Sequence, residues 1–371
     1  QPVLAFDMVR YVGEPVAIVA ANHPEVAKKA IDAIYVDYEQ LDPLVNSREA
    51  IEAAPIHPDG NVIRHLVINH GDPDAVGNIT VEGEYEVGMQ DQAFLGTESG
   101  IAFPSADGGV DLHISTQWLH SDRDQVASAL NLPEDLVRVT LAGVGGAFGG
   151  REDVSMHVHL CMLALHTGRP VKMVYDRNES FLGHVHRHPA KIWFRHSADD
   201  SGALVKVEAK VILDGGAYAS TTSAVLANAC CFSVGPYRVP NALIEGWGVR
   251  TNNPPCGAMR GFGNVQTCFA AEAQMDKLAK ALSLDPVEFR LLNALETGDI
   301  LITGQEITGT APVKEVLTSL AEYPLPEPTK GGLLDLPGGT GRTTDKSHVK
   351  RGVGYACLLY TSDAADDTLC V

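Results

Sequence analysis

Residues 143–152, Gly-Val-Gly-Gly-Ala-Phe-Gly-Gly-Arg-Glu, are the stretch on which the interpretation of this chain depends. Five glycines fall within its first eight residues, between a strand-like run at 137–141 and a helix-like run at 154–166. Glycine at this density indicates backbone at positive φ, or backbone that lies directly against another group. Strand, glycine loop and helix also occur in this order where helix-start N–H groups bind phosphate. The pattern alone leaves a tight structural turn and a cofactor cradle equally open.

The dinucleotide-binding motif G-x-G-x-x-G does not fit this loop. A count from Gly143 places Phe148 where the motif has its third glycine. That glycine normally allows close packing between helix and strand, and phenylalanine cannot do so. The loop therefore disfavours an enzyme that binds a nicotinamide dinucleotide.

The composition is that of a globular chain with two or three domains. Of 371 residues, 45% are hydrophobic and 20% charged, and no apolar run is long enough to cross a bilayer. The net charge of −19 argues against nucleic acid or an anionic membrane as a partner. The seven cysteines lack paired C-x-x-C spacing. We therefore expect free thiols in the reducing cytoplasm, and no zinc or iron–sulfur site in this chain.

Both ends of the sequence suggest a piece of a longer polypeptide. Gln1 has no preceding Met, and the chain enters a strand pattern almost at once. Residues 357–371, CLLYTSDAADDTLCV, resemble a translated sequencing-library adapter, so we leave them out of the fold prediction.

Hydrophobic periodicity predicts an α+β fold with no internal repeat. Near the start, strands at 9–20 and 34–38 flank a helix that begins near Pro24, and a polar connector spans 55–78. Further strands are expected at 79–86, 101–103, 110–115, 137–141, 171–175, 191–196 and 204–213. Helices are expected at 121–130, 154–166 and 264–282, with another beginning after Asp285.

Four runs resemble one family, the molybdenum-cofactor-binding subunit of xanthine dehydrogenases and aldehyde oxidases. They are VRYVGEPVAIVA with IYVDYEQLDPLV, DLHISTQWLH, GVGGAFGGRED and AMRGFGNVQ. The resemblance extends in order from about Val9 to Gly354. It is strongest for bacterial xanthine dehydrogenase molybdenum subunits made as separate chains.

The resemblance implies a domain layout of mixed sheets with packed helices. Residues 1–54 would be a truncated a/b hammerhead domain, 55–78 a connector and 79–322 the first molybdenum-cofactor-binding domain. Residues 323–350 would be a linker, 351–356 the start of a second cofactor-binding domain, and 357–371 the adapter artefact.

The resemblance also implies an activity. It is the oxidative hydroxylation of a purine such as xanthine or hypoxanthine, with water as the oxygen source. The cofactor would be molybdenum held by molybdopterin cytosine dinucleotide, with no direct protein ligand to the metal. Electrons would pass to separate [2Fe–2S] and FAD subunits. An aldehyde or another N-heterocycle as substrate, and a non-catalytic paralogue, are the alternatives.

The family's site roles transfer to matching residues of this chain. Gln117 would hydrogen-bond an oxo group on the metal, and Gly146, Ala147, Phe148 and Gly149 would contact the cofactor. Glu152 and Arg260 would face the polar edge of the substrate as the catalytic pair, with Arg260 also touching the cofactor. Phe262 would help to sandwich a flat ring, as aromatic faces do.

Two departures from the family pattern concern these roles. Arg151 stands where the family often has Lys, an exchange of little consequence if the group only carries charge. Asn228 stands where xanthine-oxidising relatives have a second substrate-contacting Arg, which puts xanthine itself in question. The family's general-base Glu lies in a C-terminal half that this sequence does not include, so the chain alone should be inactive.

Each residue also has a plain structural interpretation. Gln117 could end a strand, Phe148 and Phe262 could be core aromatics, and Arg260 could form a loop salt bridge. Glu152 could stabilise the start of the next helix. His184, His186 and His188 alternate, so on a strand they would share one face and could bind zinc, although His188-Pro189 also matches a structural family motif. Cys256 is a possible nucleophile without an identifiable partner, and a free loop thiol is the simpler interpretation.

Overall fold

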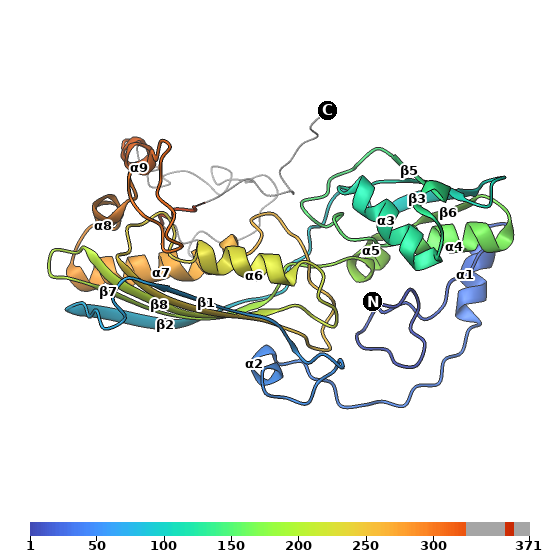
Figure 1. Ribbon diagram of the computed structural model, residues 1–371, viewed down its shortest axis with the longest axis horizontal. Helices are drawn as coiled ribbons and strands as arrows, with labels where there is room; N and C mark the ends of the chain where they lie inside the picture. The colour runs from blue at the N-terminus through green and yellow to red at the C-terminus, as the bar shows by residue number, and fades with distance from the viewer. Residues whose placement is uncertain (324–352, 360–371) are drawn as a thin grey trace, which may run out of the picture.

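The computed structural model describes residues 1–323 and 353–359. Two lobes, each built on one β-sheet, lie side by side along the longest axis of the molecule (Figure 1). We call them the five-stranded lobe and the four-stranded lobe. The expected α+β class with mixed sheets is confirmed.

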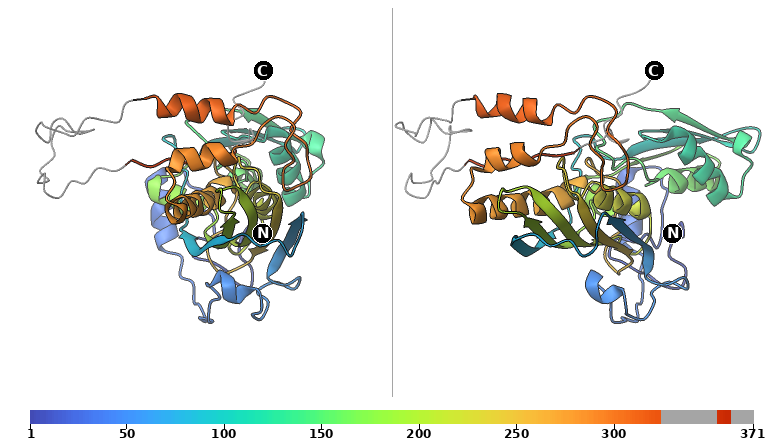
Figure 2. Two further views of the ribbon diagram at one scale, coloured as in Figure 1. Left: turned by 90° about the vertical axis from the view of Figure 1, so that its left-hand side faces the viewer. Right: turned by 60° about the vertical axis from the view of Figure 1, so that its left-hand side comes forward.

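The five-stranded lobe has the strand order β1-β9-β8-β7-β2. Its strands are β1 (Val62–His70), β9 (Asn241–Val249), β8 (Leu204–Asp214), β7 (Ala190–Ala198) and β2 (Ile79–Val87). β8 and β9 are parallel, and the other neighbours are antiparallel. Helices α6 (Thr222–Cys231) and α7 (Asn264–Leu282) cover one face of this sheet (Figure 1). Beyond α7, helices α8 (Pro286–Asn293) and α9 (Val313–Ala321) stack outward (Figure 2).

The four-stranded lobe has the strand order β5-β4-β3-β6. Its strands are β5 (Val137–Leu141), β4 (Val110–Ile114), β3 (Ser99–Pro104) and β6 (Val171–Val174). Helices α3 (Leu119–Leu130) and α4 (His157–Thr167) pack against it, with the short helices η1 (Glu134–Leu136) and α5 (Arg177–Gly183) nearby. Side chains at every second position of β4 are buried against α4, so the alternation along 110–115 correctly predicted this strand.

The core of the five-stranded lobe explains why α7 forms where the sequence predicts it. Ala270, Ala271, Met275 and Leu278 recur at helical spacing and are fully buried. The small alanines allow the helix to approach β7 closely. Asp285 caps α8 by accepting hydrogen bonds from the backbone N–H groups of Val287 and Glu288, as the motif after residue 284 indicates.

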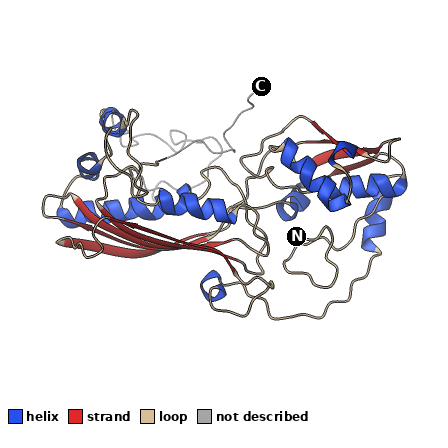
Figure 3. Cartoon of the chain, in the orientation of Figure 1, coloured by secondary structure: helices blue, strands red, loops and turns tan. Residues whose placement is uncertain are grey.

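The N-terminal segment contains helices but no strands. Residues 1–61, all described, form α1 (Pro24–Asp32) and α2 (Ser47–Ala50) and otherwise run as loop (Figure 3). The strands predicted at 9–20 and 34–38 are therefore wrong. A strand needs a neighbour to bond its N–H and C=O groups, and apolar residues there, such as Val12 and Tyr35, are 80% and 87% exposed instead of packed.

The predicted connector, 55–78, contains an edge strand. β1 lies within it and pairs antiparallel with β9 along its whole length. Polar residues such as His65 and Asn69 interrupt its apolar pattern, because one face of the edge strand is exposed. Segment 55–78 is thus part of the five-stranded sheet.

The C-terminal expectations fall largely outside the described residues. These are the predicted linker after Tyr323, the first two residues of 351–356, where a second cofactor-binding domain was expected to start, and 360–371. Residues 353–355 are not a strand. Residues 357–359 contact the start of α7, where the Asn264 amide donates to the Leu359 carbonyl at 3.0 Å.

Within residues 1–323 and 353–359, no helix combines the length and apolar character needed to cross a membrane.

Candidate functional site

Two glycine-rich loops, one from each lobe, meet between the sheets. The first runs from β5 to α4 and contains Phe148, and the second runs from β9 to α7 and contains Arg260. The Arg260 N–H donates to the Phe148 carbonyl at 3.0 Å. Gly149 also lies so close to the second loop that an added Cβ would be 2.8 Å from the Ala258 carbonyl carbon. The tertiary fold therefore joins the two motifs that the sequence singled out.

Both phenylalanines of the predicted site have left-handed backbone. Phe148 has φ +52° and Phe262 has φ +41°, a region that residues with a bulky side chain rarely adopt. Such strain tends to cluster at functional sites, where the surrounding structure holds it in place. Phe148 remains 43% exposed instead of joining a core, which favours a ligand-contacting role over the core-aromatic interpretation.

Gln117 holds the first loop. Its side-chain oxygen accepts hydrogen bonds from the N–H groups of Gly149 at 3.1 Å and Arg151 at 3.3 Å. Its own backbone N–H donates to the Arg151 carbonyl at 3.0 Å. Because the amide oxygen is engaged in this way, a hydrogen bond from Gln117 to an oxo group would have to come from Nε2, which is the correct donor for that acceptor.

Arg151 has a bonding role that its position in the motif did not indicate. Its guanidinium is buried, donates to the carbonyls of Gly146 (3.0 Å) and Gly96, and lies 4.3 Å above the centre of the Phe94 ring. Burial lowers its pKa from the usual value, and the nearby Glu98 carboxylate opposes that effect. A lysine has one nitrogen and could not reproduce this planar set of contacts. The group therefore does more than carry charge.

The remaining residues of the first loop divide into an exposed and a buried side. Gly143 and Phe148 are exposed, whereas Gly149 and Glu152 are buried, with Glu152 only 2% exposed. The Glu152 N–H donates to the Gly149 carbonyl at 3.2 Å, and the Gly150 N–H donates to the Ala147 carbonyl at 3.0 Å. The loop thus exposes backbone on one side, and on its other side it is buried against the rest of the protein.

A cavity of about 570 Å³ opens beside the junction of the two loops. Among the described residues that line it are Gln92, Phe148, Arg187, Met259, Arg260 and Val265. Phe148 and Arg260 are the predicted site residues found there. Phe262 belongs to the same turn, because its N–H donates to the Met259 carbonyl at 2.8 Å.

Asn228 lies on α6, near the second loop. An added Cβ on Gly263 would be 2.3 Å from the Val225 carbonyl, so α6 lies directly against the residue after Phe262. The Asn228 carbonyl accepts the N–H of Phe232 at the end of the helix. The structure therefore brings Asn228 to the neighbourhood of the site, and a direct contact with substrate stays a prediction.

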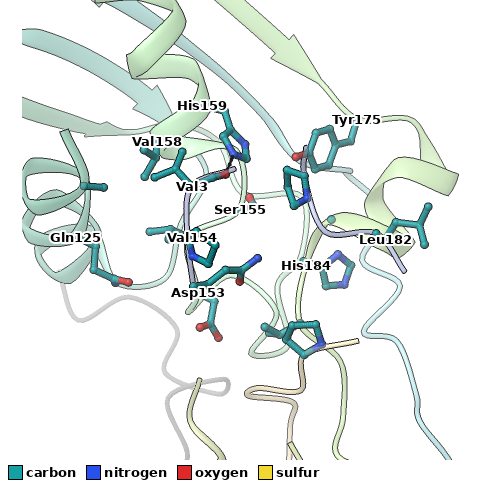
Figure 4. Close-up of a pocket in the computed structure, with 18 of the residues that line it drawn as sticks. Val3, Gln125, Asp153, Val154, Ser155, Val158, His159, Tyr175, Leu182 and His184 are labelled. Atoms are coloured by element: carbon teal, nitrogen blue, oxygen red, sulfur yellow. Dashed lines mark hydrogen bonds between the residues drawn. The ribbon is translucent and has the colours of Figure 1, made fainter. Parts of the chain in front are cut away.

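A larger cavity, of about 890 Å³, lies elsewhere, between the N-terminal segment and the four-stranded lobe. Figure 4 shows its walls, which include Val3, Gln125, Asp153, His159 and Tyr175. Its described lining includes His184 but none of the residues predicted to bind cofactor or substrate. We therefore place the candidate site at the smaller cavity, where the two motif loops meet.

A buried charged cluster under the first loop could not be foreseen from the sequence. His184 Nδ1 is 2.9 Å from a Glu98 oxygen, and Nε2 is 3.2 Å from an Asp91 oxygen. Burial disfavours the charged imidazolium, but the two carboxylates outweigh it and raise the pKa of His184 to about 9. The Phe94 ring, which also lies against Gly150 of the first loop, is 5.0 Å from the imidazole between ring centres. The sequence motif at 184–188 was the available signal, but the carboxylate partners are about 90 residues away.

The three histidines do not share one site. The His184 and His186 rings stack at 5.5 Å, and both face Asp91. His188 instead bonds the Thr222 hydroxyl at 2.8 Å, and burial followed by the charge of Arg187 lowers its pKa to about 3. The chain is not a regular strand here, so the alternation did not place the three on one face. Cys256 is fully buried, which raises the pKa of its thiol and agrees with an unreactive loop cysteine.

Replacing His184 by glutamine should give a pH-dependent loss of stability. The folded pKa of His184 is about 9, above the ordinary 6.5, so its contribution is fully present below pH 6.5 and is lost as the pH rises through 9. The difference in unfolding free energy between wild type and His184→Gln should therefore shrink from pH 6.5 to 9.5 in urea titrations. The exposed His120→Gln is the control. A difference that stays constant over this range would contradict the ionic role.

Replacing Gly149 by alanine should loosen the junction of the two loops. The residue has φ +94°, and its new Cβ would collide with the Ala258 backbone, so we expect a loss of about 1–3 kcal/mol in unfolding free energy. Gly143→Ala is the matched control, because a Cβ there meets no atom within 4 Å. Chemical denaturation of both variants measures the effect, and equal losses would show that the close approach does not matter.

Comparison with known proteins identifies the two parts of the chain. Residues 56–294 match the family model of the molybdopterin cofactor-binding domain. Residues 1–42 match the a/b hammerhead domain of aldehyde oxidase and xanthine dehydrogenase.

Individual relatives agree with these matches. The large molybdopterin subunit of Eubacterium barkeri nicotinate dehydrogenase is 38% identical over 87% of this chain. The xanthine dehydrogenase molybdenum-binding subunit of Escherichia coli O157:H7 is 32% identical over 96%. The aldehyde oxidoreductase structure from Desulfovibrio gigas superposes with a TM-score of 0.83 at 28% identity over 86% of this chain. The chain spans 77%, 47% and 36% of these three proteins, respectively.

Proposed function

Because this chain belongs to the molybdopterin cofactor-binding family of xanthine dehydrogenases and aldehyde oxidases, we propose that it forms part of the catalytic subunit of a molybdenum hydroxylase for N-heterocycles. The observation that carries the proposal is the bond between the Arg260 N–H and the Phe148 carbonyl, which joins the two motif loops beside a cavity. A purine is the first candidate substrate.

The loop geometry fits a large cofactor. Exposed backbone at Gly143, the exposed Phe148 ring and the adjoining cavity leave room for a bulky group on one side of the loop. Glycine there lets backbone amides approach polar groups without an intervening side chain. When bound, the molybdenum cofactor would supply the oxygen-transfer and redox chemistry. We propose that it is the cytosine dinucleotide form, held by Gly146, Ala147, Phe148 and Gly149.

The protein would contribute positioning and charge. The Gln117 amide would donate from Nε2 toward the cofactor, and the Phe148 and Phe262 rings would orient a flat substrate by contact with its face. The Arg260 guanidinium would stabilise negative charge that develops on the ring, and Glu152 would accept a ring N–H. Electrons would leave through partner subunits that carry [2Fe–2S] and FAD.

A pyridine carboxylate is the second candidate substrate. The nicotinate dehydrogenase relative is 38% identical to this chain, which covers 77% of it. In addition, the uncharged Asn228 stands at the position where a second substrate-contacting arginine is expected in a xanthine-oxidising protein. These two observations favour a heterocycle other than xanthine without changing the reaction type.

The test uses the full-length protein, co-expressed with its iron–sulfur and FAD partners. We expect bound molybdenum with a cytidine nucleotide, measured by elemental analysis and by nucleotide release. Turnover of hypoxanthine, xanthine and nicotinate should exceed that of benzaldehyde. A purified complex without molybdenum would support the non-catalytic paralogue instead, and faster benzaldehyde turnover would make the protein an aldehyde oxidoreductase.

A further inference from the structure

Gln92 lies where the two motif loops meet, and its side chain contacts both of them. The residue is 7% exposed and lines the candidate cavity. Its Nε2 donates to the Ala258 carbonyl of the second loop at 2.7 Å. A Cβ added to Gly150 of the first loop would lie 3.0 Å from the amide carbon of Gln92, so the backbone of that loop packs against this side chain. One amide group therefore serves both loops.

The Ala258 carbonyl is also the part of the second loop against which the first loop lies. An added Cβ on Gly149 would be 2.8 Å from both the carbon and the oxygen of this carbonyl. Two residues further along, the Arg260 N–H donates to the Phe148 carbonyl at 3.0 Å. A shift of the Ala258 carbonyl would therefore alter both contacts between the loops. The hydrogen bond from Gln92 is placed to fix how the loops meet.

The orientation of the Gln92 amide is set by the buried charged cluster. Its side-chain oxygen lies 3.2 Å from His184 Nε2. Although burial opposes the charged form, the Asp91 and Glu98 carboxylates raise the pKa of His184 to about 9. At neutral pH both ring nitrogens therefore carry protons, and the ring can only donate hydrogen bonds. The oxygen of Gln92 must then face His184, which leaves the amide nitrogen to donate to Ala258.

We propose that Gln92 is a positioning residue that aligns the two motif loops at the candidate site. The inference rests on the function proposed above and adds a residue to its mechanism. Ala258 is fully buried, and a buried carbonyl that loses its donor costs free energy, so removal of the Gln92 amide favours other arrangements of the second loop. Small displacements of this kind lower turnover even when they begin away from the reacting atoms. Gln92 acts through Phe148 and Arg260 and takes no part in the chemistry itself.

The experiment measures hydrogen exchange and turnover of the full-length complex for wild type, Gln92→Met and Gln92→Glu. Methionine keeps the length of the side chain but removes both hydrogen-bonding groups. Glutamate keeps an oxygen toward His184, but its carboxylate cannot donate to Ala258. We expect both variants to speed amide exchange in the peptide that contains Arg260 about tenfold, because one buried hydrogen bond is lost. Exchange in β7 should stay as in wild type.

Turnover shows whether this alignment matters for the reaction. The substrate is hypoxanthine, xanthine or nicotinate, whichever wild type oxidises, and rates are divided by bound molybdenum. Both variants should lower kcat about tenfold and leave KM within about twofold, because Arg260 is proposed to act on charge that develops during the reaction. A role limited to overall stability would leave kcat per molybdenum unchanged. Gln125→Met, which removes an exposed glutamine of α3, should match wild type in exchange and turnover.

The two measurements separate this inference from the proposed function. Exchange is measured without substrate, so it reports on the loops even if wild type holds no molybdenum and oxidises none of the three compounds. That result would count against the proposed function alone. The role of Gln92 is overturned by unchanged exchange around Arg260, by exchange that rises equally in β7, by unchanged kcat per molybdenum, or by a Gln92→Glu variant that equals wild type.

Discussion

Replacing Arg260 by methionine is expected to lower kcat/KM for heterocycle turnover by about 10²- to 10³-fold, the usual cost of removing a group that stabilises developing negative charge. Methionine has similar length but no charge and no donors. The backbone bonds of residue 260, to the Phe148 carbonyl and from the Arg187 guanidinium, do not involve its side chain. The loop junction should therefore persist, and the loss should report on the guanidinium alone.

The measurement is steady-state turnover by the complete complex, with molybdenum content determined on the same sample. Arg195→Met is the matched control, because it removes an arginine of β7 that is 44% exposed and is not among the described residues lining the candidate cavity. Unchanged purine and pyridine turnover in Arg260→Met would refute the assigned role. Loss of molybdenum from this variant would show that the guanidinium mainly retains the cofactor.

Replacing Arg290 by methionine is expected to lower the unfolding free energy by about 3–5 kcal/mol, because it leaves a buried carboxylate without its cation. The Arg290 side chain is fully buried, and it contacts both Glu272, at 2.9 Å, and Asp276, at 2.9 Å. Glu272 also accepts the Tyr237 hydroxyl at 2.7 Å, which ties α7 and α8 to the chain after α6. The change in urea midpoint measures the loss.

The same chain provides two controls for this prediction. Arg195→Met breaks exposed pairs with Glu82 and Glu208 and should cost about 0.2–1 kcal/mol. A double change, Glu272→Met with Arg290→Met, removes both charges and should recover much of the stability. A loss of under about 1 kcal/mol in the single variant would show that Glu272 can become protonated or hydrated without Arg290.

Elements with strong local patterns were predicted well. β5 spans 137–141 and α7 spans 264–282, as expected, because burial on one face produces a period that the sequence displays. Two kinds of element were missed. β1 lies at a sheet edge and keeps polar residues on its exposed face, while β9 has glycines at 246 and 248 against α6. The N-terminal strands were over-predicted, since a β pattern has no effect without a partner strand.

The site was predicted in its residue types but not in its contacts. The motifs pointed to Gln117, Phe148 and Arg260, and the structure brings these motif loops together. The sequence did not show that Gln117 uses its oxygen to hold the loop, or that Arg151 bonds two carbonyls. It also gave no sign that His184 lies between two carboxylates. Each of these depends on residues that are distant in sequence.

By itself, the sequence determined the fold class, the family and the two glycine loops, because these are encoded in local periodicity and in ordered motifs. Only the tertiary structure decided that the Phe148 carbonyl meets the Arg260 N–H and that Arg187 joins Arg260 at one cavity. The physical reason is that such contacts link two sheets through long-range packing. Their geometry depends on how α6 and α7 position the second loop against the first. No local sequence pattern encodes the distance between these two loops.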